Sequence, residues 1–185
     1  MVAWGNAPGF VDNEENSLAL KARFTQTAVQ YIISAMPQSL SRVILHIIFS
    51  TKNREPWLDA NVRPRMHAYL ATICRDLGAD FVQSGGVADH VHIVTTLPRT
   101  VSQAQLIEQI KKASSKWIKT LDARYRGFFW QSGYGAFSVN PSQLEIVLQY
   151  IKTQPEHHRT RTFQDEYREL LRRHGVDFDE RYVWD

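Results

Sequence analysis

Short apolar segments bounded by polar residues alternate along this chain with longer segments in which apolar residues recur at helical spacing. Residues 42–50 are rich in Val, Ile, Leu and Phe, and the run is short enough to be a buried strand. Two more strands are predicted at 79–84 and 89–96, with the Gly85-Gly86 pair in a hairpin turn between them. The pattern therefore predicts a β-sheet with antiparallel neighbours.

Four helices are predicted around these strands, at 59–78, 102–121, 140–155 and 163–173. Each is amphipathic, and the second carries its lysines mostly outside the apolar stripe. A further strand or strand pair is predicted over 128–139. This order of strands and helices predicts an α+β fold in which helices lie on an antiparallel sheet.

The length of 185 residues fits one ordinary domain with a short appendage. Residues 1–35 begin with a turn-like stretch and have only a weak helical pattern, so they are predicted to be an N-terminal extension outside the core, with a helix that caps the domain as the alternative. The core domain is predicted at 36–158, and residues 159–185 are predicted to form a C-terminal helix and tail.

The formal net charge of +3 permits an acidic partner without requiring one. Cys74 is the only cysteine, which excludes an intramolecular disulfide and a cysteine-rich zinc site. No apolar run approaches the roughly 18 residues that a membrane span needs, and the N-terminus does not have the pattern of a secretion signal. We therefore expect a cytoplasmic protein without a membrane partner.

A His-Val-His motif, His90-Val91-His92, lies within one of the predicted strands. Side chains alternate between the two faces of a strand, so both imidazoles project from the same side with their Cα atoms about 7 Å apart. Imidazole nitrogens bind divalent transition metals, and one ion fits between the two rings. The alternative is a pair of hydrogen-bonded histidines on a solvated strand face.

Tyr150 and Gln154 lie four residues apart on the predicted helix 140–155 and hence on the same helix face. A phenolic oxygen can attack a phosphodiester, a metal can polarise the non-bridging oxygen, and an amide oxygen can complete the coordination of that metal. The alternative is a core tyrosine and a surface glutamine. The catalytic interpretation requires the strand and the helix to touch.

Between about Pro37 and His158, the chain resembles the single-tyrosine HUH (His-hydrophobe-His) transposases of bacterial insertion sequences, which are related to the REP-associated tyrosine transposases. Three motifs in order carry the resemblance: His46 followed by the segment 51–54, then the segment 89–92, then the segment 150–158. The resemblance implies an α+β fold with a ferredoxin-like or RRM-like antiparallel sheet, helices packed on it and the nucleophile on the last core helix.

The same resemblance implies a transposase that cleaves and rejoins single-stranded DNA next to hairpins through a 5′-phosphotyrosine intermediate. It gives Tyr150 the role of nucleophile and makes His90, His92 and Gln154 the ligands of Mg²⁺ or Mn²⁺. It also implies a homodimer, in which one subunit's tyrosine helix can complete the partner's metal site.

Basic residues near these motifs are candidates for binding DNA phosphates, and aromatic residues are candidates for stacking on unpaired bases. The candidate DNA-binding residues are Lys52, Arg54, Lys112 and Lys116, with Lys111 and Lys119 in the same helical group, and the candidate stacking residues are Trp57, Trp117 and Trp130. A soluble charged surface is the alternative for the lysines, and core packing is favoured for Trp117.

Other residues have competing interpretations. Tyr134 lies between two glycines and is the rival nucleophile. His46 either orients the metal histidines or is a buried, hydrogen-bonded strand residue. His157 and His158 are predicted to be loop residues at the solvated surface, with phosphate contact as the alternative.

Two other functions compete with transposition. A domesticated relative would process chromosomal repeat hairpins without moving itself. A non-catalytic nucleic-acid-binding sheet would use the histidine pair only for packing or stacking. Such modules usually expose aromatic residues on their central strands, whereas His90 and His92 occupy that place here, which favours chemistry.

Overall fold

A computed structural model describes residues 40–184, and residues 41–184 belong to one compact unit. The N-terminal extension predicted for residues 1–35 lies outside the described residues, as does the boundary between it and the predicted core. Among residues 40–184, no helix is both long and apolar enough to cross a membrane.

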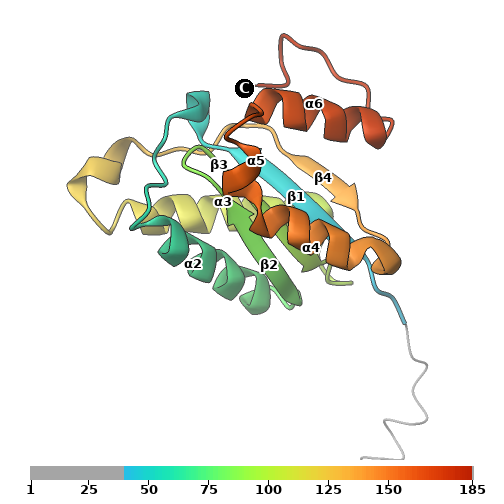
Figure 1. Cartoon of the computed structure of the whole chain (residues 1–185). Coiled ribbons are helices and arrows are strands. Elements are labelled where there is room, and N and C mark those ends of the chain that lie inside the picture. The colour runs from blue at the N-terminus through green and yellow to red at the C-terminus, as the bar shows by residue number, and fades with distance from the viewer. Residues whose placement is uncertain (1–39, 185) are drawn as a thin grey trace, which may run out of the picture. The chain divides into compact units, whose positions relative to one another are not determined.

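The unit is built on a four-stranded antiparallel sheet with the order β2-β3-β1-β4. The strands are β1 (Ile44–Ser50), β2 (Phe81–Gly86), β3 (His90–Thr96) and β4 (Gly135–Ser138). β1 and β3 are therefore the inner strands, and they pair along their whole length (Figure 1). The predicted α+β class with an antiparallel sheet is confirmed.

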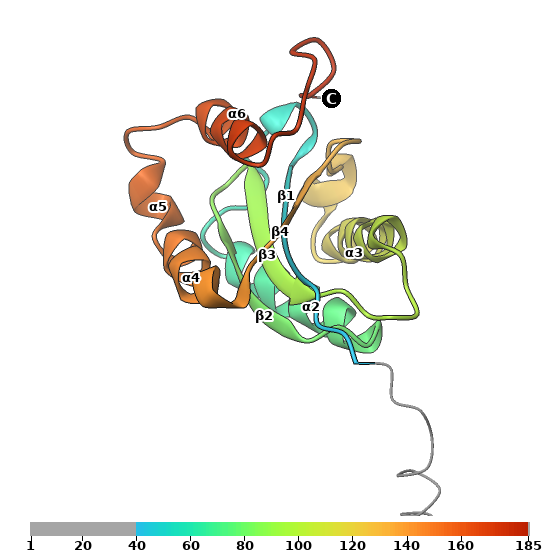
Figure 2. The same ribbon diagram turned by 90° about the vertical axis from the view of Figure 1, so that its right-hand side faces the viewer.

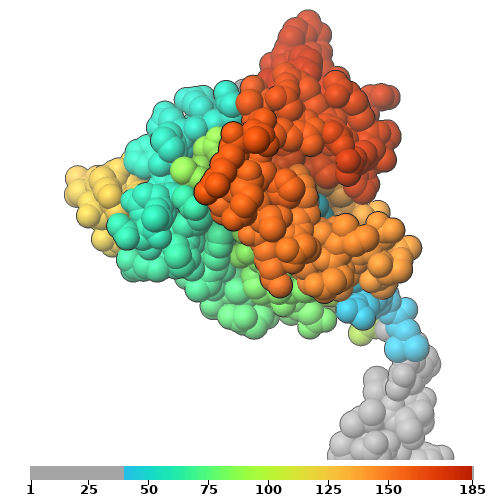
Figure 3. Space-filling view, viewed as in Figure 1, coloured from blue at the N-terminus to red at the C-terminus, as the bar shows by residue number. Residues whose placement is uncertain are grey.

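Helices cover both faces of this sheet. α2 (Arg63–Asp76) and α3 (Gln103–Ile118) pack on one face, while α4 (Leu144–Lys152), α5 (Gln154–His157) and α6 (Phe163–Arg173) lie on the other (Figure 2). In the space-filling view, α4 to α6 largely cover the second face of the sheet (Figure 3). The inner strands are thus buried on both sides, which explains why all seven residues of β1 are buried and five of them are apolar.

Alternation along the inner strands separates two cores. Leu45, Ile47 and Phe49 of β1 belong to the large cluster beneath α2 and α3. Their neighbours project to the opposite face, where Ile48 packs against α6 and Ile44 against α4. Even-numbered positions of β1 and β3 therefore face α4 to α6.

The predicted position of the hairpin turn is wrong by two residues. Gly85 and Gly86 belong to the end of β2, and the chain turns at residues 87–89. A side chain at Gly85 would meet the backbone oxygen of Ile151 on α4, since an added Cβ would lie 2.5 Å from that atom. The glycine is explained by the close packing of α4 on β2 rather than by a turn.

Other boundaries also differ from the predictions. Only Gly135–Ser138 of the predicted strand 128–139 forms a strand, and Trp130 makes an isolated bridge to Thr51. The predicted helix 140–155 is divided: a 3-10 turn precedes α4, and Thr153 separates α4 from α5. Within residues 40–184 there are three short 3-10 helices, at Lys52–Arg54, Ala123–Gly127 and Pro141–Gln143. The predicted helix 163–173 has the same bounds as α6.

Candidate active site

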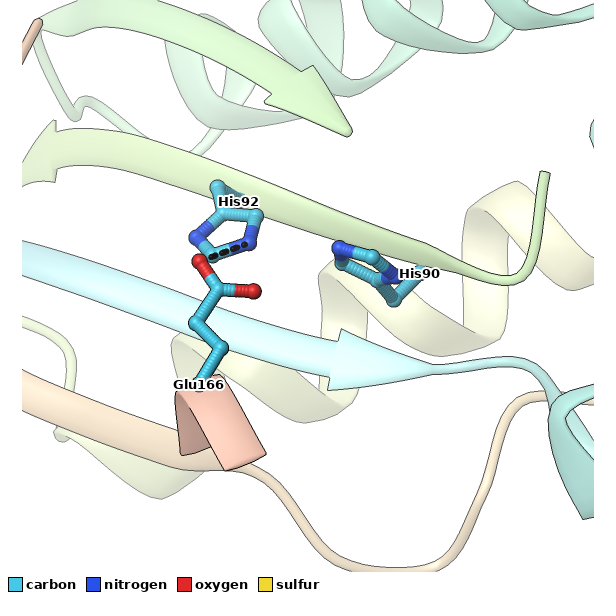
Figure 4. Close-up of side chains that lie close together, drawn as sticks. All are labelled: His90, His92 and Glu166. Carbon is cyan, nitrogen blue, oxygen red and sulfur yellow. Dashed lines mark ion pairs between the residues drawn. The ribbon is translucent and has the colours of Figure 1, made fainter. Parts of the chain in front are cut away.

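His90 and His92 project from β3 to the face covered by α4 to α6, as the strand period predicts. Both side chains are fully buried, and their ring centroids lie 5.2 Å apart. Their rings face the carboxylate of Glu166, which approaches from α6 (Figure 4). The two imidazoles are thus on one side of the sheet and open toward the same small space.

Each of the two imidazoles is held by a contact to its Nδ1 atom. Asp89 Oδ1 lies 2.7 Å from His90 Nδ1, and His46 Nε2 lies 2.9 Å from His92 Nδ1. Contacts of this kind fix the ring orientation of metal-binding histidines and leave the Nε2 atoms for the ion. Both interpretations of His46 therefore hold together, since it is buried and orients His92.

Burial keeps two of these imidazoles neutral. It lowers the pKa of His46 to about 4, although the charge of Glu166 acts in the opposite direction. It lowers the pKa of His92 well below the usual histidine value, again against the charge of Glu166. A neutral imidazole is the form that binds a metal ion.

Glu166, which the sequence analysis missed, is nearly fully buried at 3% exposure. One ligand atom from each of His90, His92 and Glu166 lies within 4.8 Å of the others, and His92 Nε2 is 3.6 Å from Glu166 Oε1. A sequence signal existed: Glu166 lies among Phe163, Tyr167 and Leu170 on the inner side of an amphipathic helix. A carboxylate on such a side needs a buried partner.

Gln154 is buried between the histidine pair and Glu166. Its Oε1 atom lies 3.3 Å from His90 Nε2, and its Nε2 atom donates a 2.7 Å hydrogen bond to Glu166 Oε1. The amide oxygen therefore points toward the site, as a ligand would. The break at Thr153 places Gln154 at the start of α5, so it does not share a continuous helix with Tyr150.

Tyr150 reaches the same carboxylate from α4. Its hydroxyl donates a hydrogen bond to Glu166 Oε1, and its ring centroid lies 6.1 Å from that of His92. Burial raises the pKa of the Tyr150 phenol, and the charge and hydrogen bond of Glu166 raise it further, so the phenol is protonated here. The side chain also forms part of the wall of a cavity of about 430 Å³ between α4 and α6.

His158 differs from its prediction as a solvated loop residue. Its side chain is 12% exposed, and its Nε2 atom lies 2.9 Å from Glu166 Oε2 and 2.9 Å from Gln154 Oε1. Burial by itself would lower the pKa of His158, but its hydrogen bond to Glu166 and the charge of that carboxylate raise it. His157 is exposed, as predicted, but it is the last residue of α5 and not part of a loop.

Glu166 is ionised in this surrounding. Burial by itself would raise its pKa, yet the contacts of the carboxylate, first among them the hydrogen bond from His158, outweigh burial, and the pKa of Glu166 lies well below its usual value. Hydrogen bonds from Tyr150 and Gln154 act in the same direction. A negative charge therefore lies next to the neutral imidazole of His92.

These residues fit a divalent metal ion. His92 Nε2 has no hydrogen-bond partner although it is fully buried, and an unpaired buried polar atom is costly. Two imidazoles combined with amide and carboxylate oxygens are a donor set that suits divalent ions such as Mn²⁺. The unpaired nitrogen of His92 is therefore available for an ion at this position.

The candidate DNA-binding residues divide into two groups. Lys52 and Arg54 are exposed, and Arg54 borders a hollow that also includes Asp89 and His158. Lys112 and Lys116 are exposed on α3, which covers the opposite face of the sheet from the histidine pair. The four residues thus do not form a single patch around the site.

Most of the neighbouring candidates have structural partners. The ammonium group of Lys111 donates hydrogen bonds to the three backbone oxygens of residues 131–133. Trp130 is buried and donates to Ser114 Oγ, so it is not available for stacking on a base. Trp117 stacks on Tyr69 with ring centroids 4.7 Å apart, which is the core packing favoured for it.

The rival nucleophile lies elsewhere. Tyr134 is partly exposed and borders a hollow beside α3, together with Lys111 and Lys112. That hollow contains none of His90, His92 and Glu166, whereas Tyr150 hydrogen-bonds to Glu166. The geometry therefore favours Tyr150 over Tyr134 as the tyrosine that meets the histidine pair.

Comparison with known proteins gives a family and a fold. Residues 39–154 match the family described as "Transposase IS200 like". A candidate transposase from Deinococcus radiodurans has a similar structure, with a TM-score of 0.51 and 20% identity over 64% of this chain and 98% of that one. A REP-associated tyrosine transposase, solved bound to a REP hairpin, gives a TM-score of 0.50 and 16% identity over 66% of this chain and 73% of that one. No curated protein matches the chain.

Proposed function

Because the chain belongs to the family of IS200-like transposases, we propose that it cleaves and rejoins single-stranded DNA next to hairpins by metal-dependent transesterification at Tyr150. One observation carries this proposal. Within a single chain, the Tyr150 hydroxyl hydrogen-bonds to a carboxylate that lies 3.6 Å from His92 Nε2. A nucleophile and a pair of metal-binding side chains therefore meet, although 58 positions separate Tyr150 from His92 in the sequence.

His90 and His92 would hold the ion through their Nε2 atoms, with the amide oxygen of Gln154 within reach. When bound, Mg²⁺ or Mn²⁺ would polarise a non-bridging oxygen of the scissile phosphate and offset the charge that builds up there. Asp89 and His46 would keep the two rings in place through their contacts with the Nδ1 atoms.

The reaction itself exchanges one phosphoester bond for another. The Tyr150 oxygen forms a bond to phosphorus as the bond to the 3′ oxygen breaks, which leaves a 5′-phosphotyrosine link and a free 3′-hydroxyl. The phenolic proton is lost and the departing oxygen gains one. In the reverse step, a 3′-hydroxyl attacks the link, restores the phosphodiester and releases Tyr150. Since bond energy is conserved in the link, no ATP is needed.

Hairpin DNA is the proposed substrate, and a REP hairpin is the ligand named for the REP-associated transposase whose fold this chain shares. The contact between Tyr150 and Glu166 supports assembly of the site within one subunit. The homodimer implied by the sequence resemblance stays a prediction. The covered sheet face argues against a binding module that uses exposed central strands, because His90 and His92 are fully buried on the face that α4 to α6 cover.

The test is covalent capture of DNA. The full chain is incubated with labelled single-stranded hairpin DNA from the flanks of its own gene, with Mn²⁺ or with EDTA, and then run on a denaturing gel. We expect an adduct only with Mn²⁺. Tyr150→Phe should abolish the adduct while leaving hairpin binding intact, and Tyr134→Phe, the matched control, should retain it. An adduct that persists in Tyr150→Phe would reassign the nucleophile, and no adduct from a folded chain with any hairpin would contradict the proposed function.

A further inference from the structure

The metal donors predicted from the sequence all lie within residues 39–154, the segment that matches the family. Glu166 lies 12 positions beyond Gln154, the last matched residue, in the C-terminal helix α6. Its carboxylate nevertheless lies within 4.8 Å of donor atoms of His90 and His92 (Figure 4). The site therefore includes a residue from outside the matched segment.

We propose that Glu166 is a ligand of the same metal ion as His90 and His92, so that α6 supplies part of the metal site. This inference rests on the proposed function for the presence of the ion. It gives the C-terminal helix a role in metal binding. This helix lies outside the segment that matches the family, and none of the predicted donors His90, His92 and Gln154 belongs to it.

The separation between donor atoms supports a shared ion. Glu166 Oε1 lies 3.6 Å from His92 Nε2, which is too long for a hydrogen bond. Two ligands that each lie about 2.1 Å from one ion are roughly 3 to 3.5 Å apart. A slight inward movement of a flexible glutamate therefore suffices for both atoms to bind one ion, and it would give the unpaired His92 nitrogen a partner.

The charge balance of the site points the same way. The predicted donors His90, His92 and Gln154 contribute no negative charge, because imidazole and amide ligands bind a metal as neutral groups, so they offset none of the charge of a divalent cation. Glu166 is the buried carboxylate that faces the imidazoles. A carboxylate is a preferred ligand of Mg²⁺ and Mn²⁺, and buried charges are stable when they pair or coordinate a metal.

Neighbouring contacts hold Glu166 in position for this role. Gln154 donates to its Oε1 atom at 2.7 Å, and His158 Nε2 lies 2.9 Å from its Oε2 atom. Phe163 and Tyr167, its neighbours on the inner side of α6, pack with Ile48 of β1. The packing of α6 on the sheet therefore keeps the Glu166 side chain beside the histidines, and metal binding should in turn stabilise that packing.

The experiment measures Mn²⁺ binding to the full chain without DNA, by titration calorimetry and by the electron paramagnetic resonance signal of free Mn²⁺. We expect Glu166→Gln to weaken Mn²⁺ binding at least tenfold. Loss of a hydrogen bond to a metal ligand already lowers metal affinity by about this much, and loss of a ligand should lower it no less. The control is Glu169→Gln, one turn further along α6, whose carboxylate pairs with Arg161 and Arg173 and not with the histidines. It should bind Mn²⁺ as the wild type does.

A second measurement does not depend on how the variant folds. In the wild-type chain, Mn²⁺ should slow hydrogen exchange at the amides of α6, since the ion would tie this helix to β3. Unchanged exchange in α6 during saturating Mn²⁺ binding would overturn the proposal. A folded Glu166→Gln chain that binds Mn²⁺ like the wild type would also overturn it. If that chain formed more DNA adduct as well, the result would show that the carboxylate obstructs the site instead of binding the ion.

The outcomes separate this inference from the proposed function. If the wild type forms the DNA adduct with Mn²⁺ but Glu166→Gln keeps full Mn²⁺ affinity, the inference fails and the function stands. If Mn²⁺ binding depends on Glu166 but no hairpin gives an adduct, the function fails and the ligand assignment stands.

Discussion

The hydroxyl of Tyr150, on α4, donates a hydrogen bond to the carboxylate of Glu166, on α6. The same carboxylate lies next to His92, so one buried group connects the proposed nucleophile with the proposed metal ligands. Since burial and Glu166 together keep the phenol protonated, Tyr150 is held near the site in its resting form. DNA must therefore change this contact when the tyrosine attacks.

His46→Ala should weaken Mn²⁺ binding by about 10- to 100-fold, because the variant removes the contact that orients the His92 ring. The ring of His92 would then rotate more freely, while both metal-binding nitrogens stay in the chain. Calorimetric titration with Mn²⁺ measures the change. His157→Ala, at an exposed histidine, is the control and should leave the affinity unchanged. Equal affinities in the wild type and His46→Ala would show that the contact does not position His92.

Gly85→Ala should destabilise the fold by about 1 to 3 kcal/mol, as overpacking of a filled core does. The added methyl group would lie 2.5 Å from Ile151 O and 2.6 Å from Ile151 Cγ2, so α4 would have to move away from β2. Because Tyr150 is the neighbour of Ile151, adduct formation should fall as well. Urea unfolding measures the free energy of unfolding.

Gly127→Ala is the matched control for that substitution. The nearest atom to its added methyl group is 3.4 Å away, on the Trp57 ring, which is an ordinary contact. The control should change the free energy of unfolding only slightly. If both variants lost the same stability, close packing of α4 on β2 would not be the reason for Gly85.

The stability of the fold should fall in acid partly because of His67, on α2. Burial, with a smaller contribution from the charge of Arg63, lowers the pKa of His67 to about 4. The unfolded chain binds a proton at this position below about pH 6.5, whereas the folded chain does so only near pH 4. The folded state therefore loses stability as the pH falls from about 6.5 to about 4.

His67→Gln should remove this share of the pH dependence. Between pH 7 and pH 4.5, the drop in the free energy of unfolding should be about 2 kcal/mol smaller in the variant than in the wild type. Urea unfolding at the two pH values measures both drops. The same drop in both proteins would mean that His67 is protonated equally in the folded and unfolded chains.

Charge removal at the two basic groups should have different effects. Lys52→Ala with Arg54→Ala should weaken hairpin binding and reduce the slope of log affinity against log salt by up to about 1.4, since each phosphate contact on a single strand adds roughly 0.7. Lys112→Ala with Lys116→Ala changes α3, on the opposite sheet face from the histidines. It should alter binding but not the rate of adduct formation at saturating DNA. The slopes are measured by filter binding at salt concentrations from about 50 to about 300 mM, a range that includes the physiological ionic strength.

Much of the fold could be predicted from local patterns. The apolar run of β1, the His-Val-His strand and the bounds of α6 were readable because each depends on side-chain period and on turn residues nearby. Gly85 was misread, since a glycine pair between strands is typical of a turn. Its actual reason is the distant backbone of Ile151, which no local pattern contains.

The candidate site likewise has features that local spacing predicts and contacts that it does not. The strand period was enough to predict that His90 and His92 share a face. Helical spacing predicted one helix face for Tyr150 and Gln154, but the break at Thr153 divides that helix, and both side chains instead meet at Glu166. Spacing could not reveal that His46 holds His92 from the neighbouring strand, because that contact depends on the pairing of β1 with β3.

The amino-acid sequence by itself determined which side chains share a strand face or a helix face, because those relations follow from the repeat of a single element. Only the tertiary structure decided that Glu166 meets the two histidines, since 76 positions of chain separate it from His90. The physical reason is that this meeting depends on how the apolar side of α6 packs against the sheet. That packing is a property of the whole fold and is not encoded in the spacing of any one segment.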